Sequence, residues 1–195
     1  MFTKVKLFFA LVAEDAKALG RERLSMPFCL MALLGLNRFS AVFLHRVEAA
    51  LFLKGFPLTA FSRLASRWNG LWNSCEISPL AKIGPGFCLP HPTGVVIGTI
   101  LAGKNLTVLQ NATIALKDRG LASDDFRNFP SFGDNVVVGA GAAVLGDIVI
   151  SDGAVIGSNA VVIIDVPAGC LAVGNPARVI APRSKAPSRK LSVLA

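Results

Sequence analysis

The sequence predicts a mainly β protein, a parallel β-helix of six-residue repeats preceded by an α-helical segment. Three observations carry this prediction: six consecutive six-residue blocks over residues 132–166, less regular sixes from Ile77 onward, and helix-like periodicity before them. Each block opens with an apolar residue and carries a small or branched residue four places later. A chain that turns a corner after every short strand has this period, so three blocks close one triangular coil.

Apolar residues recur at helical spacing in four segments of the N-terminal region, residues 1–75. The expected helices cover residues 2–19, a short segment after Ser25, residues 37–54 and residues 58–68. Gly20 is a typical stop for the first helix. Ser25 is a suitable N-cap for the second, with Pro27 in its first turn. The apolar surface of these helices predicts contact with the coil stack, with another subunit or peripherally with a membrane.

The β-helix is expected to cover residues 76–180, with two irregularities. The block LPHPTGVV is two residues longer than six, and residues 117–131, KDRGLASDDFRNFPS, lose the register. This polar segment is expected to bulge from the stack as a loop, where binding and chemistry collect. After Val166, Pro167 and Gly169 break the repeat and are expected to end the stack. Residues 181–195 are predicted to form a basic disordered tail.

Composition limits the function classes. The chain of 195 residues is 53% hydrophobic with 18 glycines, which excludes a disordered protein and allows one domain with a smaller extension. The formal net charge is +8, and the positive charges near the C-terminus predict a solvated tail, not a nucleic-acid site. The four cysteines form no CxxC pair, so we expect no metal site and a cytoplasmic protein. No segment has the roughly 18 uninterrupted apolar residues of a membrane span.

The chain has two histidines, and they differ in context. His45 lies within the third expected helix, where a packing or hydrogen-bonding role is predicted. His91 lies between two prolines in the overlong block, which presents its imidazole rigidly at a corner. A neutral histidine there could accept a proton from an attacking hydroxyl. Glu76, fifteen residues earlier, could lie near His91 on the neighbouring coil and fix its tautomer.

The segment CEISPLAKIGPGFCLPHPTGVVIG, the later GAGAAVLGDI and the closing AVGNPARVI resemble the serine acetyltransferase branch of the hexapeptide-repeat acyltransferases. The resemblance covers residues 76–180 and extends weakly into FLHRVEAALFLKG. It implies a left-handed β-helix, a homotrimer with active sites between subunits, and acetyl-CoA as the acetyl donor. In this resemblance His91 matches the catalytic base, and Glu76 stands where the family has the aspartate that orients it.

The resemblance also implies where CoA binds. It would lie along the outer groove between subunits and contact Ala140, Ser158 and the turn from Gly174 to Arg178. The Arg178 guanidinium, with Arg183 or Lys185, could pair with the CoA phosphates. The mechanism would be a single general-base step, with a backbone N–H stabilising the oxyanion.

Several positions depart from the serine enzymes. Pro90 replaces the aspartate before the catalytic histidine, and Asn128 and Phe129 replace the arginine and the histidine of an Asp-Arg-His-Pro run. A loose alignment places Arg23 where the family has a serine-binding aspartate. Losing charged partners removes discrimination for a ligand. We therefore expect Asn128 and Phe129 to bind an altered acceptor, a hydroxyl of a sugar or a cell-surface polysaccharide precursor, which could be lipid-linked.

Two alternatives stay open at this point. The retained histidine and carboxylate also fit a serine O-acetyltransferase of cysteine biosynthesis. The replacement of one of the family's two site histidines also fits a catalytically inactive trimeric β-helix scaffold.

Overall fold

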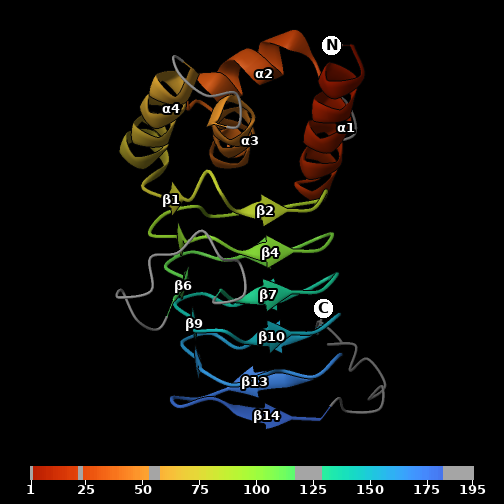
Figure 1. Ribbon diagram of the computed structural model, residues 1–195, viewed down its shortest axis with the longest axis vertical. Helices are drawn as coiled ribbons and strands as arrows, with labels where there is room; N and C mark the ends of the chain where they lie inside the picture. The colour runs from red at the N-terminus through yellow and green to blue at the C-terminus, as the bar shows by residue number, and fades with distance from the viewer. Residues whose placement is uncertain (1, 22–23, 53–57, 117–128, 182–195) are drawn as a thin grey trace, which may run out of the picture.

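The computed structural model describes residues 2–21, 24–52, 58–116 and 129–181. Within them, four helices lie at one end of a stack of short strands (Figure 1). The helices are α1 (Phe2–Ala18), α2 (Met26–Leu33), α3 (Ser40–Phe52) and α4 (Leu58–Asn73). Ser25 caps α2 as expected, because its hydroxyl accepts a hydrogen bond from the Phe28 N–H at 3.4 Å. The expected loop and basic tail lie largely outside the described residues.

The strands form three sheets, which are the three faces of a left-handed parallel β-helix. The first face holds β1 (Glu76–Ile77), β3 (Val96–Ile97), β6 (Thr113–Ala115), β9 (Ala143–Leu145) and β12 (Val161–Val162). The second holds β2 (Lys82–Ile83), β4 (Leu101–Ala102), β7 (Ser131–Phe132) and β10 (Val149–Ile150). The third holds β5 (Thr107–Val108), β8 (Val137–Val138), β11 (Val155–Ile156), β13 (Leu171–Val173) and β14 (Arg178–Ile180). The predicted fold class is confirmed.

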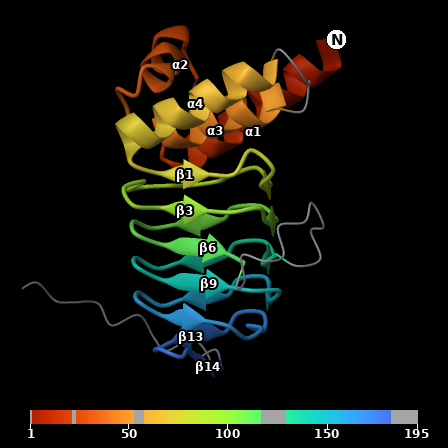
Figure 2. The ribbon, with the colours of Figure 1, turned by 60° about the vertical axis from the view of Figure 1, so that its left-hand side comes forward.

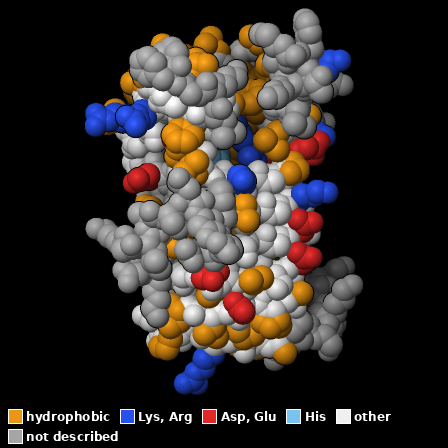
Figure 3. All heavy atoms as spheres, in the orientation of Figure 1, with side chains coloured by type: hydrophobic (Ala, Val, Ile, Leu, Met, Phe, Trp, Pro, Cys, Tyr) orange, Lys and Arg blue, Asp and Glu red, His pale blue; other side chains and the backbone are white. Residues whose placement is uncertain are grey.

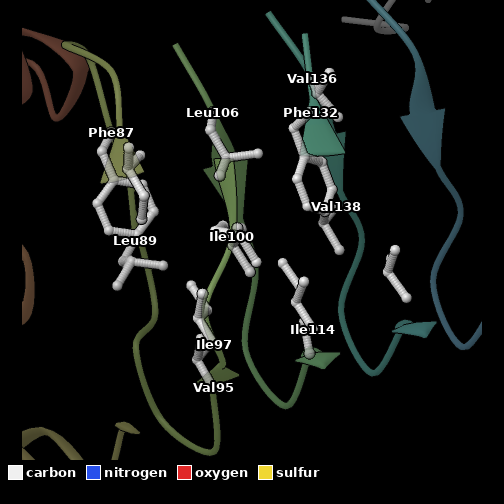
Figure 4. Packing of buried hydrophobic residues seen from close by; sticks show 14 of the residues in the cluster. Phe87, Leu89, Val95, Ile97, Ile100, Leu106, Ile114, Phe132, Val136 and Val138 are labelled. Carbon is white, nitrogen blue, oxygen red and sulfur yellow. The ribbon is translucent and has the colours of Figure 1, made fainter. Parts of the chain in front are cut away.

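The core of the β-helix is a column of inward-pointing apolar side chains. In two-residue strands such as β1, β2 and β3, the first residue is exposed and the second is buried. Side chains from successive coils pack above one another inside the prism, as Figure 4 shows for Leu106, Val136 and their neighbours. The six-residue period therefore exists because each corner returns the next apolar residue to the same interior.

The stack continues past Pro167 and Gly169, which break the repeat, because β13 adds a further strand that pairs in parallel with β11. The stack ends with β14, which folds back and pairs antiparallel with β13. The reversal uses the turn at Gly174, whose φ of 98° is in the left-handed region that glycine tolerates.

Helix α4 turns its polar side chains inward and its apolar side chains outward. The Asn69 and Asn73 amides donate to the Ala41 carbonyl and to the Ser40 hydroxyl of α3, at 3.1 and 2.9 Å. The outward face exposes large apolar side chains, and Figure 3 shows hydrophobic side chains on the surface of this helical end. These are Phe61, Leu64, Trp68, Leu71 and Trp72. No helix among the described residues is long and apolar enough to cross a membrane.

Candidate active site

His91 lies in the turn between β2 and β3, and its side chain is exposed. Cys88 pairs with Thr107, and Val96 pairs with Thr113 in the next coil. Between these two pairs the first coil has two residues more than the second. The extra length of the LPHPTGVV block is therefore accommodated at this corner, which displaces the chain around His91 from the regular path of the coils.

The same corner of the prism also carries most of the predicted CoA contacts. One line of paired residues runs down the third face, through Cys88, Thr107, Val137, Val155 and Leu171. The residues three places after these are His91, Gln110, Ala140, Ser158 and Gly174. Parallel strands lie about 4.8 Å apart, so Gln110, Ala140 and Ser158 lie one above another at this corner, which we call the corner column. The displaced segment with His91 lies at one end of the column, and the turn with Gly174 lies at the other. The fold thus brings three predicted cofactor-binding residues to the edge that begins at His91.

Backbone hydrogen bonds between successive coils hold the corner column together. The Gly141 N–H donates to the Gln110 carbonyl at 2.9 Å, and the Asn159 N–H donates to the Ala140 carbonyl at 2.8 Å. Asn159 has a φ of 58°, a left-handed conformation that asparagine tolerates better than most residues. Arg178, the fourth predicted contact, is exposed on β14 and pairs with Val173, directly before Gly174.

Glu76 opens β1 and is also exposed. It is in register with Val96, and the Gly94 N–H donates to the Ser74 carbonyl at 2.7 Å, so the segment after His91 runs alongside the start of β1. Among the described residues, no hydrogen bond joins Glu76 to His91. Their roles as base and orienting carboxylate stay predictions.

A second carboxylate near Glu76 was missed by the sequence reasoning. Glu48 on α3 is only 1% exposed and shares a side-chain hydrogen bond with Ser66 of α4. Burial raises the pKa of Glu48 to about 7; the bond to Ser66 opposes this rise and the nearby Glu76 charge adds to it. Burial, together with the charge of Glu48, raises the pKa of the Cys75 thiol to about 12. Helical spacing gave no signal for it, because Glu48 lies on the side of this helix opposite the apolar face of Phe39 and Phe43.

His45 is fully buried on α3, and its two ring nitrogens have no hydrogen-bond partner among the described residues. Its ring packs edge-on against Phe87 at a centroid distance of 6.2 Å. Burial, with a smaller effect from the Arg46 charge, lowers the pKa of His45 to about 3. An imidazole that is buried and neutral in this way packs in the core, as its helical context suggested.

The two predicted acceptor-binding residues are placed unequally. Asn128 lies outside the described residues, as does Arg23, whereas Phe129 is 9% exposed and lies two residues before the start of β7. One shallow surface groove runs beside β7 and β10, and another hollow lies on α4 beside Arg67 and Leu71. Neither contains a predicted site residue, and the corner column is exposed at His91, Ser158 and Gly174. No cluster of metal-binding side chains is present in the described ranges.

Comparisons with known proteins place the chain in a family. It is 39% identical to a serine acetyltransferase of Synechococcus elongatus over 92% of this chain and 69% of that protein. It is 32% identical to the serine acetyltransferase of Bacillus subtilis, over 95% of this chain and 83% of that one. The chain belongs to the serine acetyltransferase family. No model of a protein family matches it.

Solved structures of serine acetyltransferases agree with this membership. The soybean apoenzyme superposes with a TM-score of 0.75 at 32% identity, over 92% of this chain and 71% of the other. A serine acetyltransferase in complex with CoA superposes with a TM-score of 0.74 at 27% identity, over 92% and 72%. The prediction of an O-acetyltransferase is confirmed, as is acetyl-CoA as the co-substrate of the family.

The predicted sugar or polysaccharide acceptor is wrong, because the relatives that match nearly the whole chain are serine acetyltransferases. The prediction depended on a few substituted positions, Pro90, Asn128 and Phe129 among them. Replacing a contact residue weakens one interaction with an acceptor, but it does not by itself create recognition of another acceptor. Serine acetyltransferase, the alternative reading, is the better supported one.

Proposed function

We propose that the protein is a serine O-acetyltransferase, which transfers the acetyl group of acetyl-CoA to the hydroxyl of L-serine. The observation that carries this proposal is the corner column. The histidine that matches the family's base lies at one end of the edge on which Ala140 and Ser158 are stacked, and the Gly174 turn lies at its other end. Together with the identity to serine acetyltransferases, this arrangement supports CoA lying along the column with its thioester end toward His91.

In the proposed reaction, the neutral imidazole of His91 accepts the proton of the serine hydroxyl. The serine oxygen then forms a bond to the acetyl carbonyl carbon, and a backbone N–H of the stack stabilises the resulting oxyanion. Collapse of this intermediate breaks the carbon–sulfur bond, and the proton held by His91 goes to the departing sulfur. The products are O-acetylserine and CoA with a free thiol. Glu76 would orient His91, with the extra methylene of glutamate reaching across the corner.

The substituted positions bear on affinity for the acceptor. The family binds the charged ends of serine with groups that this chain replaces by Pro90, Asn128 and Phe129. Charge-assisted hydrogen bonds contribute about 1.5–3 kcal/mol each. We therefore expect a KM for L-serine that is higher than in relatives that retain these groups, with the transfer chemistry unchanged.

We also propose that the active form is a homotrimer in which the corner column faces a neighbouring subunit. Two observations support it: the column is exposed at His91, Ser158 and Gly174, and α4 exposes Leu71 and Trp72 at 78% and 54% of their surface. A large exposed apolar face on a helix whose polar face is already bonded indicates burial against another molecule. Peripheral membrane contact through the helices stays a prediction.

The test is release of CoA thiol by the purified protein with acetyl-CoA and L-serine. His91→Ala should lower kcat by about 100- to 10,000-fold, and added imidazole should restore part of the rate. Glu76→Gln should lower kcat, whereas Glu76→Asp should retain more activity than the amide. Circular dichroism should show all three variants folded.

Two results would contradict the proposal. Equal thiol release by His91→Ala and the wild type would remove His91 as the base. Failure of the wild-type protein to bind acetyl-CoA in calorimetry would instead favour the inactive scaffold.

A further inference from the structure

A buried ion pair joins the helices to the coil that carries His91. Arg46 of α3 donates from Nε to Asp15 Oδ2 at 2.8 Å and from Nη2 to Asp15 Oδ1 at 3.1 Å. Asp15, on α1, is fully buried, and Arg46 is 6% exposed. A buried bidentate pair is costly to desolvate unless its remaining hydrogen-bonding groups also find partners. Here all of these partners belong to the backbone of the first coil.

Arg46 takes the place of a missing coil on the second face. In the second coil, the Ala102 carbonyl accepts a hydrogen bond at 3.0 Å from the Gly84 N–H of the coil above. Ile83 is the residue of the first coil in register with Ala102, and no coil lies above it. Its carbonyl instead accepts from Arg46 Nη1 at 2.6 Å, and the next carbonyl, that of Gly84, accepts from Nη2 at 2.7 Å.

At the following corner, the Asp15 carboxylate replaces the backbone carbonyl that a further coil would provide. In later coils the N–H at this corner donates to a carbonyl of the coil above. The pairs are Asn105 to Pro85, Asn135 to Lys104 and Gly153 to Asp134, at 2.9, 2.7 and 2.8 Å. In the first coil, the N–H groups of Gly86 and Phe87 both donate to Asp15 Oδ1 at 2.9 Å. The ion pair thus supplies the donors and the acceptor that a further coil would have supplied.

The segment from Ile83 to Phe87, whose backbone bonds to the ion pair, leads directly into His91. Phe87 is fully buried, and it packs against the His45 ring and lies 6.0 Å from the Arg46 guanidinium carbon. Only four residues later the chain reaches His91, in the corner with two extra residues. Below this segment, Cys88 pairs with Thr107 of the second coil, and above it no coil lies. The chain that enters the corner is therefore held from below by the second coil and from above by the ion pair. In Figure 2 the helices lie directly over the first coil of the stack.

We propose that Asp15 and Arg46 are positioning residues for His91: they complete the first coil from above and so fix the segment that presents the imidazole. This inference rests on the proposed function of His91 as the base. It predicts that damage to the ion pair lowers kcat while the affinity for acetyl-CoA, which is bound along later coils, is retained.

Asp15→Asn is the first test. An asparagine can still accept from the Gly86 and Phe87 N–H groups, but its amide NH2 faces the Nε donor of Arg46. We expect kcat to fall on the order of 10- to 100-fold and KM for acetyl-CoA to change less than twofold, at a temperature well below unfolding. The matched control is Glu14→Gln, which removes the neighbouring carboxylate of α1 and its exposed ion pair with Lys17. The control should keep the wild-type kcat.

NMR spectroscopy gives a readout that a purely structural role would not change. The chain has two histidines, so the imidazole signal that disappears in His91→Ala reports His91. We expect a single His91 signal in the wild type and in Glu14→Gln, and several or broadened signals in Asp15→Asn. If Asp15→Asn does not fold, Arg46→Lys decides, because it keeps the charge but loses the forked donors.

The outcomes separate this inference from the proposed function. Wild-type kcat and an unchanged His91 signal in a folded Asp15→Asn or Arg46→Lys, even with a lower Tm, would overturn the positioning role. If His91→Ala retains full activity, the proposed function itself fails. Loss of kcat in both His91→Ala and Asp15→Asn, with Glu14→Gln unaffected, supports both.

Discussion

Gly139 lies so close to Ser158 of the next coil that a Cβ atom on Gly139 would stand 2.6 Å from the Ser158 nitrogen. It would also stand 2.7 Å from the Ile156 carbonyl oxygen. Both atoms belong to the backbone, so neither can rotate away. This close approach lies directly beside Ala140, within the corner column proposed to bind CoA.

Gly139→Ala should therefore destabilise the protein, by about 1–3 kcal/mol, because inserting a methyl group into a packed interior forces the backbone to shift. Chemical denaturation measures the loss. Gly70→Ala is the matched control: Gly70 is within α4, and its added Cβ would meet only the Cys75 carbonyl oxygen at 4.0 Å. That variant should be stabilised by about 0.5–1 kcal/mol. An equal change in the free energy of unfolding for Gly139→Ala and Gly70→Ala would contradict the close approach.

Glu48 should make stability depend on pH. Its pKa is raised to about 7 from an ordinary value of 4.5. Between these values the folded chain holds a proton that the unfolded chain has released, so stability falls as the pH rises through this range. Glu48→Gln keeps the hydrogen bond to Ser66 without the charge. It should be more stable than the wild type at pH 8, by about 1–3 kcal/mol, with little difference at pH 4. Tm values across this range provide the measurement.

His45 should have the opposite dependence. Its pKa is lowered to about 3 from 6.5, so the unfolded chain binds a proton that the folded chain does not. Stability due to this group is therefore present above pH 6.5 and is lost as the pH falls toward 3. His45→Leu removes two buried nitrogens without partners, and should raise stability at pH 5 by about 1 kcal/mol or more. A variant less stable than the wild type at pH 5 would indicate an additional partner for the imidazole.

Arg178→Gln should raise the KM for acetyl-CoA about 3- to 10-fold and leave kcat unchanged, because an exposed guanidinium that pairs with phosphate contributes about 1 kcal/mol. The effect should shrink at high salt. The control is Lys104→Gln, which removes an exposed cation from a different corner of the prism. A change in kcat with an unchanged KM would place Arg178 in the chemistry and not in CoA binding.

Much of the site could be predicted because it lies within the repeat. Once six residues are known to form one face, counting along the chain places Ala140 and Ser158 at the same corner. The overlong block could likewise be counted, and the structure has its two extra residues at the corner of His91. The acceptor could not be predicted in this way. Pro90 and Phe129 show which contacts with serine differ from those of the family, but they do not show which molecule the altered site binds.

By itself the sequence determined the coil, its period and the family motifs, because these depend on local spacing that every coil repeats. The way in which the stack ends, with β14 folded back onto β13, depends on an antiparallel pairing that the broken repeat conceals. Only the tertiary structure decided how the stack begins. Asp15 reaches Gly86 and Phe87 across 71 and 72 residues of sequence, and Arg46 reaches Ile83 across 37. Such contacts follow from the docking of helices onto an open coil edge, where unpaired backbone groups must be satisfied.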